Sequence, residues 1–221
     1  MIHFHIITLF PESIEAYLSS SILGRAREKK LIKISYYDPK TFAVGKHKRV
    51  DQRPYGGGPG MVLEPQAMLR AADKALKGRK HVERIFFATD GAQFDESMAK
   101  ALAQTPARGA GKGKKDILLI CGRYEGVDAR VPQILKAKPV TVGPYVLTGG
   151  ELPAATMIDA IARFVPGVLG KIESLERSRV SSPEVYTRPD VLVWKKRKYT
   201  VPEVLKSGHH AEIDKWKMDR S

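Results

Sequence analysis

Two short runs of residues decide how this chain folds: Cys121-Gly-Arg-Tyr-Glu-Gly126 and Val142-Gly-Pro-Tyr-Val-Leu-Thr-Gly-Gly-Glu-Leu-Pro153. Each comes after a short apolar run that is typical of a buried strand, Ile117-Leu-Leu-Ile120 and Pro139-Val-Thr-Val142. Glycine lets the backbone approach a ligand closely, and tyrosine offers a flat apolar face with a polar tip. Two such turns at neighbouring strand ends suit a nucleotide-like cofactor. An ordinary pair of tight turns joining strand to helix fits the spacing equally well.

Strand-like and helix-like segments alternate along most of the chain. This alternation predicts an α/β fold, with a parallel sheet and helices on both of its faces. A long stretch over 39–65 interrupts the pattern, because it is dense in glycine, proline and basic residues. The predicted strands cover 2–9, 31–37, 84–89, 116–121 and 139–143, and the predicted helices cover 11–23, 66–76, 96–104 and 151–164.

The residue composition and the periodicity of the chain change after Gly170, which predicts three parts. Residues 1–170 form the main domain. Residues 171–190 are polar, charged and without clear periodicity, which favours a linker or active-site segment. Residues 191–221 contain the basic piece Trp194-Lys-Lys-Arg-Lys-Tyr199 and a helix near 210–218. This short, reduced helical extension is too small to fold alone, so we expect it to pack on the main domain or on another subunit.

The charge balance indicates a polyanionic partner. The 221 residues include 38 Lys+Arg and 24 Asp+Glu, a formal net charge of +14. Nucleic acid is the simplest partner for such a chain. An anionic membrane is less favoured, because the basic residues lie in loops and tails rather than along an amphipathic helix. A third interpretation is that the lysines only keep the protein in solution.

Several other classes of protein are excluded by the motifs the chain lacks. Cys121 is the only cysteine, so the chain cannot form an internal disulfide or a thiolate metal cluster, and its apolar setting predicts a buried side chain. No P-loop, dinucleotide fingerprint or nucleophile elbow is present, and the histidines lack zincin spacing, so no metal ligand is predicted. The first residues lack a signal peptide's features and read as a strand, which favours a cytoplasmic protein.

A second glycine-rich string, Arg53-Pro-Tyr-Gly-Gly-Gly-Pro-Gly-Met61, predicts a sharply shaped loop. Proline fixes φ and glycine frees it, so the string is neither helix nor strand. The basic run Lys46-His-Lys-Arg-Val-Asp51 leads into it. Such an arm and loop suit contact with a phosphate or a base, and the Asp51 carboxylate can accept a hydrogen bond from a guanine edge. A flexible surface loop is the alternative, although flexible loops favour serine and glycine over paired prolines.

Arg163 lies at the far end of the helix predicted from Glu151. It is read either as a cation at the helix C-terminus or as a group that stabilises negative charge on a substrate base.

Taken together, these strings resemble the bacterial tRNA (guanine-N1)-methyltransferase family of the SPOUT class. They occur in the family's order across nearly the whole chain. The matching strings are Leu9-Phe-Pro11, Asp51-Gln-Arg-Pro-Tyr-Gly-Gly-Gly-Pro-Gly-Met61, Cys121-Gly-Arg-Tyr-Glu-Gly126, Tyr145-Val-Leu-Thr-Gly-Gly-Glu-Leu-Pro153, Arg163-Phe-Val-Pro-Gly-Val-Leu-Gly170, Tyr186-Thr-Arg-Pro189 and Gly208-His-His-Ala-Glu-Ile213.

The resemblance implies that the chain binds S-adenosylmethionine in a C-terminal trefoil knot and methylates the guanosine just 3′ of the tRNA anticodon. It also implies a homodimer whose active site lies between the subunits, and magnesium is a further expectation of the family. Asp51, Arg53, Tyr55 and Gly58 would help hold a flipped-out guanine or its neighbour. The cofactor walls would be Phe86, Phe87 and Ala88; Gly122, Tyr124, Glu125 and Gly126; and Val142, Gly143, Pro144, Tyr145, Val146, Leu147, Gly149 and Gly150.

The chain departs from the family at the general base. Guanine N1 carries a proton, so methyl transfer needs a base near it and a group that stabilises charge on the carbonyl oxygen. Arg163 matches the family's arginine, but the family's aspartate falls on Ser178 or Arg177. Glu176, followed by Glu173, is the nearest carboxylate that can replace it.

Two further departures concern the cofactor and the tRNA. The family often has Ser-Pro-Gln-Gly where this chain has Ala88-Thr-Asp-Gly91, and it usually continues with further helices beyond the point where this sequence stops. The leading hypothesis is an active tRNA (guanine-N1)-methyltransferase. The alternatives are a protein that binds S-adenosylmethionine and tRNA with weak or lost catalysis, and a methyltransferase for another RNA position.

Overall fold

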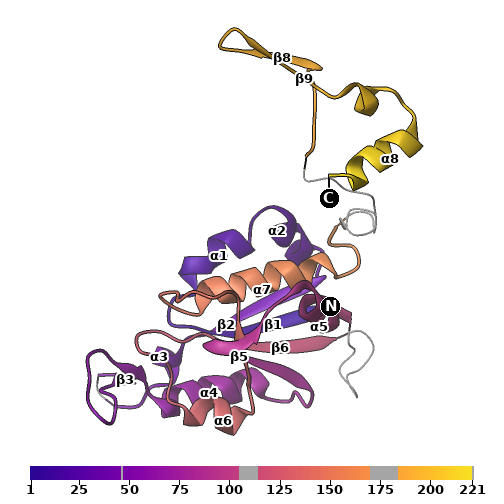
Figure 1. The fold of residues 1–221 in the computed structure, drawn as a ribbon. Coiled ribbons are helices and arrows are strands. Elements are labelled where there is room, and N and C mark those ends of the chain that lie inside the picture. Colours follow the sequence, from indigo (N-terminus) through magenta and orange to yellow (C-terminus); the bar gives the residue numbers. More distant parts are fainter. Residues whose placement is uncertain (46, 105–113, 170–183, 221) are drawn as a thin grey trace. The chain divides into compact units, whose positions relative to one another are not determined.

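A computed structural model describes residues 1–45, 47–104, 114–169 and 184–220 (Figure 1). The chain divides into two compact units, Met1–Leu169 and Gly170–Ser221. Among the described residues, none of the helices has both the length and the apolar character needed to span a bilayer.

The first unit is built on a parallel five-stranded sheet, as the alternation of segments predicts. Its strand order is β2-β1-β6-β5-β7, and every neighbouring pair is parallel. The carboxyl ends of β5, β6 and β7 therefore meet at one edge. The strands are β1 (Ile2–Ile7), β2 (Ile32–Tyr37), β5 (Val82–Gln93), β6 (Lys115–Ile120) and β7 (Lys138–Thr141).

Helices cover both faces of this sheet, which confirms the predicted layers (Figure 1). Side chains of β6 alternate between two cores, with Ile117 and Leu119 on one face and Leu118 and Ile120 on the other. Burial on both faces explains why this strand reads as an unbroken apolar run. One face carries α1 (Glu12–Leu18), α2 (Ser21–Glu28), α5 (Glu96–Gln104) and α7 (Glu151–Arg163); the other carries α3 (Pro39–Phe42), α4 (Pro65–Leu76) and α6 (Arg130–Leu135).

Several predicted boundaries were wrong, and the contacts explain two of them. The single helix predicted over 11–23 is broken between α1 and α2, where the Ser19 and Ser20 hydroxyls donate to backbone carbonyls of the preceding turn. The strand predicted to end near Asp90-Gly91 continues to Gln93. The register of β5 against β7 shifts between Phe87 and Ala92. A Cβ on Gly91 would lie only 2.4 Å from the backbone nitrogen of Val140, so only glycine fits at this irregularity.

The irregular stretch over 39–65 contains a small hairpin that carries the glycine-rich loop. Its strands are β3 (Asp51–Gln52) and β4 (Val62–Leu63), paired antiparallel. Gly56, Gly57, Gly58 and Gly60 all have positive φ, which agrees with the sharply shaped loop expected from the sequence.

The second unit contains more than the predicted helix. Helix α8 (His210–Met218) agrees with the prediction, and it follows a short 3₁₀ turn, η3 (Glu203–Lys206). The basic piece forms an antiparallel hairpin of β8 (Val191–Trp194) and β9 (Arg197–Thr200), which the sequence analysis did not anticipate. Tyr186 packs edge-on against Trp216 of α8, with ring centroids 6.2 Å apart.

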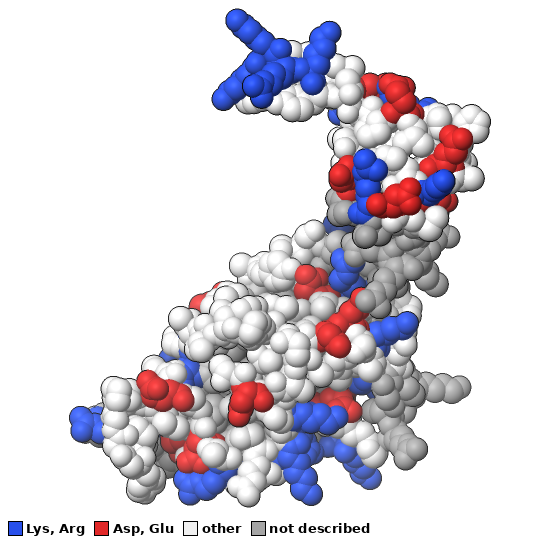
Figure 2. All heavy atoms as spheres, viewed as in Figure 1, with Lys and Arg blue, Asp and Glu red and all other residues white. Residues whose placement is uncertain are grey.

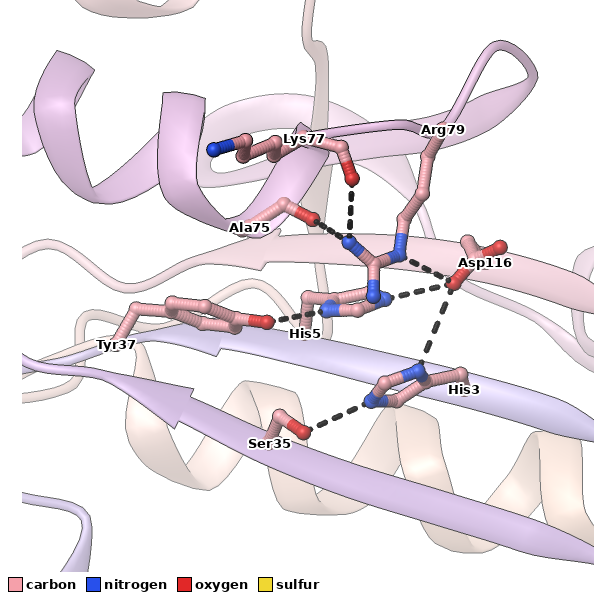
Figure 3. Close-up of polar contacts among 8 residues, drawn as sticks. All are labelled: His3, His5, Ser35, Tyr37, Ala75, Lys77, Arg79 and Asp116. Atoms are coloured by element: carbon pink, nitrogen blue, oxygen red, sulfur yellow. Dashed lines mark hydrogen bonds and ion pairs between the residues drawn. The ribbon is translucent and has the colours of Figure 1, made fainter.

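Two histidines of β1 lie in a polar network on the α4 face of the sheet (Figure 3). His5 Nε2 lies 2.8 Å from Asp116 Oδ1, and Arg79 Nε donates to the same oxygen at 3.1 Å. Because a carboxylate only accepts, His5 donates through Nε2, and its Nδ1 accepts from the Tyr37 hydroxyl at 2.9 Å. His3 Nε2 lies 2.8 Å from Ser35 Oγ.

The ligand atoms of His3, His5 and Asp116 lie within 4.8 Å of one another, a spacing compatible with a metal ion. Sequence spacing could not reveal this cluster, because Asp116 comes from a different strand. The Arg79 guanidinium already occupies the cation position beside Asp116, and Arg79 Nη1 is held by Ala75 O at 2.9 Å. We therefore interpret the cluster as a satisfied structural network.

This network predicts that the protein loses stability in mild acid. Burial lowers the pKa of His3 from 6.5 to about 4, and burial also lowers the pKa of His5. Between pH 6.5 and about pH 4, His3 binds a proton in the unfolded chain but not in the folded chain. The free energy of unfolding therefore falls as the pH falls through this range. At pH 5, His3 alone should account for a loss of about 2 kcal/mol.

Urea unfolding at pH 8 and pH 5 measures this loss. A His3→Gln variant should show a flatter pH dependence, while the variant of the exposed His81, His81→Gln, should match the wild type. An undiminished pH dependence in His3→Gln would contradict the assignment.

Candidate active site

The two strings that follow β6 and β7 lie against each other at the carboxyl edge of the sheet. Gly150 N donates to Gly122 O at 3.0 Å, and Arg123 forms a β-bridge with Gly149. A Cβ on Gly150 would lie only 2.5 Å from Cys121 Cα. Glycine at this position thus allows a backbone approach that any side chain would block.

A cavity of about 460 Å³ opens where these two strings meet the end of β5. Its size is typical of small-molecule sites. Tyr124 lines it with a left-handed backbone, φ 59°, which is uncommon for a residue other than glycine. The structure brings together most of the residues predicted to bind the cofactor, namely Phe86, Phe87, Ala88, Gly122, Tyr124, Glu125, Gly126, Val142, Tyr145, Val146, Leu147, Gly149 and Gly150.

Two predicted cofactor residues, Gly143 and Pro144, do not line the cavity. The Gly143 backbone instead packs against the ring of Tyr145. Other lining residues were not predicted: Thr89, Asp90, Arg123, Val127, Val140, Thr141, Thr148 and Pro153. Arg123, Thr148 and Pro153 stand inside the two quoted strings, so the sequence carried a signal for them.

An ion pair between a buried carboxylate and a cavity-lining arginine joins the two strings. Arg123 Nε lies 2.9 Å from Glu151 Oε2, although the alignment falls short of a hydrogen bond. Glu151 is only 2% exposed, and its other oxygen accepts from the Thr8 hydroxyl at 2.7 Å. The Arg123 guanidinium also stacks 4.8 Å from the Phe10 ring centroid. A buried carboxylate needs such partners. Through them, the segment that follows β1 is linked to both loops.

Cys121 is 2% exposed beneath these loops, as predicted. Burial raises the pKa of its thiol well above the usual value, which disfavours a thiolate nucleophile.

The glycine-rich loop is tied to one wall of the cavity. Glu125 N donates to Met61 O and Leu63 N donates to Gly126 O, both at 2.9 Å. The Glu125 side chain also lies against Gly60, where a Cβ would clash with it. The four residues predicted to hold the substrate, Asp51, Arg53, Tyr55 and Gly58, do not line the cavity but belong to the hairpin attached to it.

Of the two predicted catalytic residues, only Arg163 lies in the described part of the chain, and it does not line the cavity. Arg163 is the last residue of α7, whereas Gly150 and Pro153, at the start of that helix, line the cavity. At a rise of about 1.5 Å per residue, the 13 residues of α7 place Arg163 about 18 Å along the helix axis from Glu151. Glu176 lies outside the described residues, as do Glu173, Arg177 and Ser178.

The close contact at Gly150 predicts a sharp difference between two alanine substitutions. Gly150→Ala should lower the free energy of unfolding by about 1–3 kcal/mol, because its Cβ would overlap the Cys121 backbone. Gly122→Ala is the matched control from the facing loop, since its Cβ would lie 3.5 Å from the nearest atom, Val127 Cγ2. Urea denaturation compares the two, and equal losses would contradict the geometry.

Comparison with known proteins bears on what this cavity does. The family model described as "tRNA (Guanine-1)-methyltransferase TrmD" matches residues 2–221. The chain is 43% identical to the tRNA (guanine-N(1)-)-methyltransferase of Actinobacillus pleuropneumoniae serotype 5b (strain L20), over 98% of this chain and 84% of that protein. The protein of the same name from Haemophilus influenzae (strain PittEE) is 42% identical, over 98% and 85%. The chain therefore belongs to the tRNA (guanine-1)-methyltransferase TrmD family.

Proposed function

We propose that the protein transfers a methyl group from S-adenosylmethionine to N1 of the guanosine 3′ of the anticodon in tRNA. The observation that carries this proposal is the cavity formed where two glycine-containing loops contact each other, with a glycine-rich hairpin attached to its wall by backbone hydrogen bonds. Family membership supports the reaction class.

The cavity residues fit the proposed cofactor. Aromatic side chains of Phe86, Tyr124 and Tyr145 provide flat apolar surface, and the glycines leave backbone N–H and C=O groups accessible. S-adenosylmethionine would supply an electrophilic methyl group. The trefoil knot enters this proposal through the family resemblance, and the contacting segments Gly149-Gly150 and Cys121-Gly122 would be part of it.

The tRNA would meet the hairpin of β3 and β4. A second hollow of about 460 Å³ lies beside this hairpin and is lined by His47, Lys48 and Arg49, among others. Such side chains suit phosphate oxygens. We therefore assign Asp51, Arg53, Tyr55 and Gly58 to the substrate side, where they would position a flipped-out guanine or its neighbour.

The chemistry requires a base and a cation near the guanine. The N1 proton must leave as the methyl group arrives, and negative charge then develops on the carbonyl oxygen. We assign the role of general base to Glu176 and the stabilisation of the developing negative charge to Arg163. Because Arg163 lies about 18 Å along α7 from the cavity end, a site completed by Arg163 of a second subunit is favoured, which implies a homodimer.

The remaining parts of the proposal follow from the family. The knotted domain would span 1–170, the active-site segment 171–190 and the tRNA-binding extension 191–221, in a cytoplasmic enzyme. Magnesium has no support among the described residues near the cavity, because the cluster with metal-ligand spacing is His3, His5 and Asp116 on β1 and β6.

The decisive experiment uses labelled S-adenosylmethionine and two tRNAs that differ only at the nucleotide 3′ of the anticodon. We expect label on the tRNA with guanosine and none on the tRNA with adenosine. Label on both would assign the enzyme to another RNA position. Tight binding of cofactor and tRNA without label would indicate a binding protein that has lost catalysis.

A Glu176→Gln variant tests the proposed base. We expect kcat to fall by roughly 10²- to 10⁴-fold with little change in the affinity for S-adenosylmethionine. Glu173→Gln is the matched control, and it should retain most activity. Full activity in Glu176→Gln would remove Glu176 as the base.

A further inference from the structure

Within the second unit, the described residues leave both faces of the hairpin of β8 and β9 uncovered. Every residue of both strands is exposed, and Val201 N closes the base by donating to Asp190 O at 2.9 Å. Figure 2 shows Lys and Arg side chains gathered at its tip. An isolated two-stranded hairpin is marginal in water, so exposed apolar side chains on it indicate a surface that gains a partner.

The turn of this hairpin places cations where glycine is usual. Trp194 pairs with Arg197, so Lys195 and Lys196 form a two-residue turn, and both have positive φ, 46° and 63°. Turns of this type favour asparagine and glycine, because a Cβ is disfavoured at positive φ. Together with Arg197 and Lys198, the two lysines form four consecutive cations. These four positive charges repel one another, and binding a polyanion would reduce this repulsion.

The register gives one face of the hairpin a particular composition. Residues directly opposite each other in an antiparallel pair share a face. Trp194 therefore lies on the same face as Arg197, and the pair Leu192 and Tyr199 lies two residues further along that face. Trp194 is 62% exposed and Tyr199 is 52% exposed. Flat aromatic rings beside a guanidinium are typical of surfaces that stack on unpaired bases.

We propose that this hairpin is an RNA-binding element, in which the lysines of the turn contact phosphates and Trp194 and Tyr199 stack on unpaired bases of the tRNA. The inference rests on the proposed function, because the bound RNA is the proposed methyl acceptor. A membrane partner is less favoured, since apolar residues occupy both faces of the hairpin and leave no single face to enter a bilayer.

The first test removes two charges while keeping the turn. Lys195→Asn/Lys196→Gly creates a favoured hairpin turn, so the hairpin should remain folded. We expect weaker tRNA binding and a smaller salt dependence of the binding constant, with the log–log slope reduced by about 1 for each phosphate that the variant no longer neutralises. Lys29→Asn/Lys30→Gly is the matched control, because Lys30 also has a positive φ, 56°, in the first unit. This control should keep the wild-type slope.

The second test addresses stacking. Trp194→Val keeps a strand-forming side chain but removes the ring, and it should weaken tRNA binding by roughly 5- to 100-fold with an unchanged salt slope. Val193→Thr, on the opposite face, should bind as the wild type does. All variants should keep the wild-type melting temperature and the wild-type affinity for S-adenosylmethionine, which shows that any effect on tRNA binding is local.

Two results would overturn the inference while the proposed function stands. One is a wild type that methylates tRNA while the hairpin variants bind tRNA with unchanged affinity and slope. The other is a set of hairpin variants that bind tRNA as the wild type does but no longer bind phosphatidylserine vesicles that the wild type binds. That result would assign the hairpin to a membrane surface. A wild type that binds no tRNA would instead refute the proposed function, and this inference with it.

Discussion

The close approach of two backbone segments, Gly149-Gly150 against Cys121-Gly122, is the constraint on which the candidate site depends. The hydrogen bond from Gly150 to Gly122 and the absence of a Cβ on Gly150 bring the loops after β6 and β7 together. Parallel pairing of β5 with both β6 and β7 places these loops at the same edge of the sheet. The cavity is the space that remains between them and the end of β5.

Polar contacts then hold this arrangement from two sides. At the cavity wall, Glu151 joins Arg123 of one loop to Thr8, which directly follows β1, so the loops are tied to the end of that strand. Beside it, the backbone of Glu125 and Gly126 holds the glycine-rich hairpin at Met61 and Leu63. The cavity wall and the attachment of the glycine-rich hairpin thus share one short segment, 121–126.

Much of the fold was predictable because local pattern and tertiary structure agree. The apolar runs mark strands buried on both faces, and helix α5 has the predicted bounds, 96–104. The wrong predictions arose where tertiary contact overrides local pattern. Strand β5 runs past Gly91 because the chain packs against Val140, and the hairpin of β8 and β9 bends at two lysines that no turn preference would select. Within the site, Arg123 was overlooked because its partner, Glu151, stands in the other string.

The sequence by itself determined the α/β class, the family and the identity of the two loops, because glycine strings at strand ends are local features with little freedom of placement. Only the tertiary structure decided which residues meet. It brought Glu125 against the glycine-rich hairpin and Arg123 against Glu151, and it set Arg163 at the far end of α7 from the cavity. It also gathered His3, His5 and Asp116 from two strands. These contacts join residues far apart in the chain, and the strand order and register that create them are not local properties.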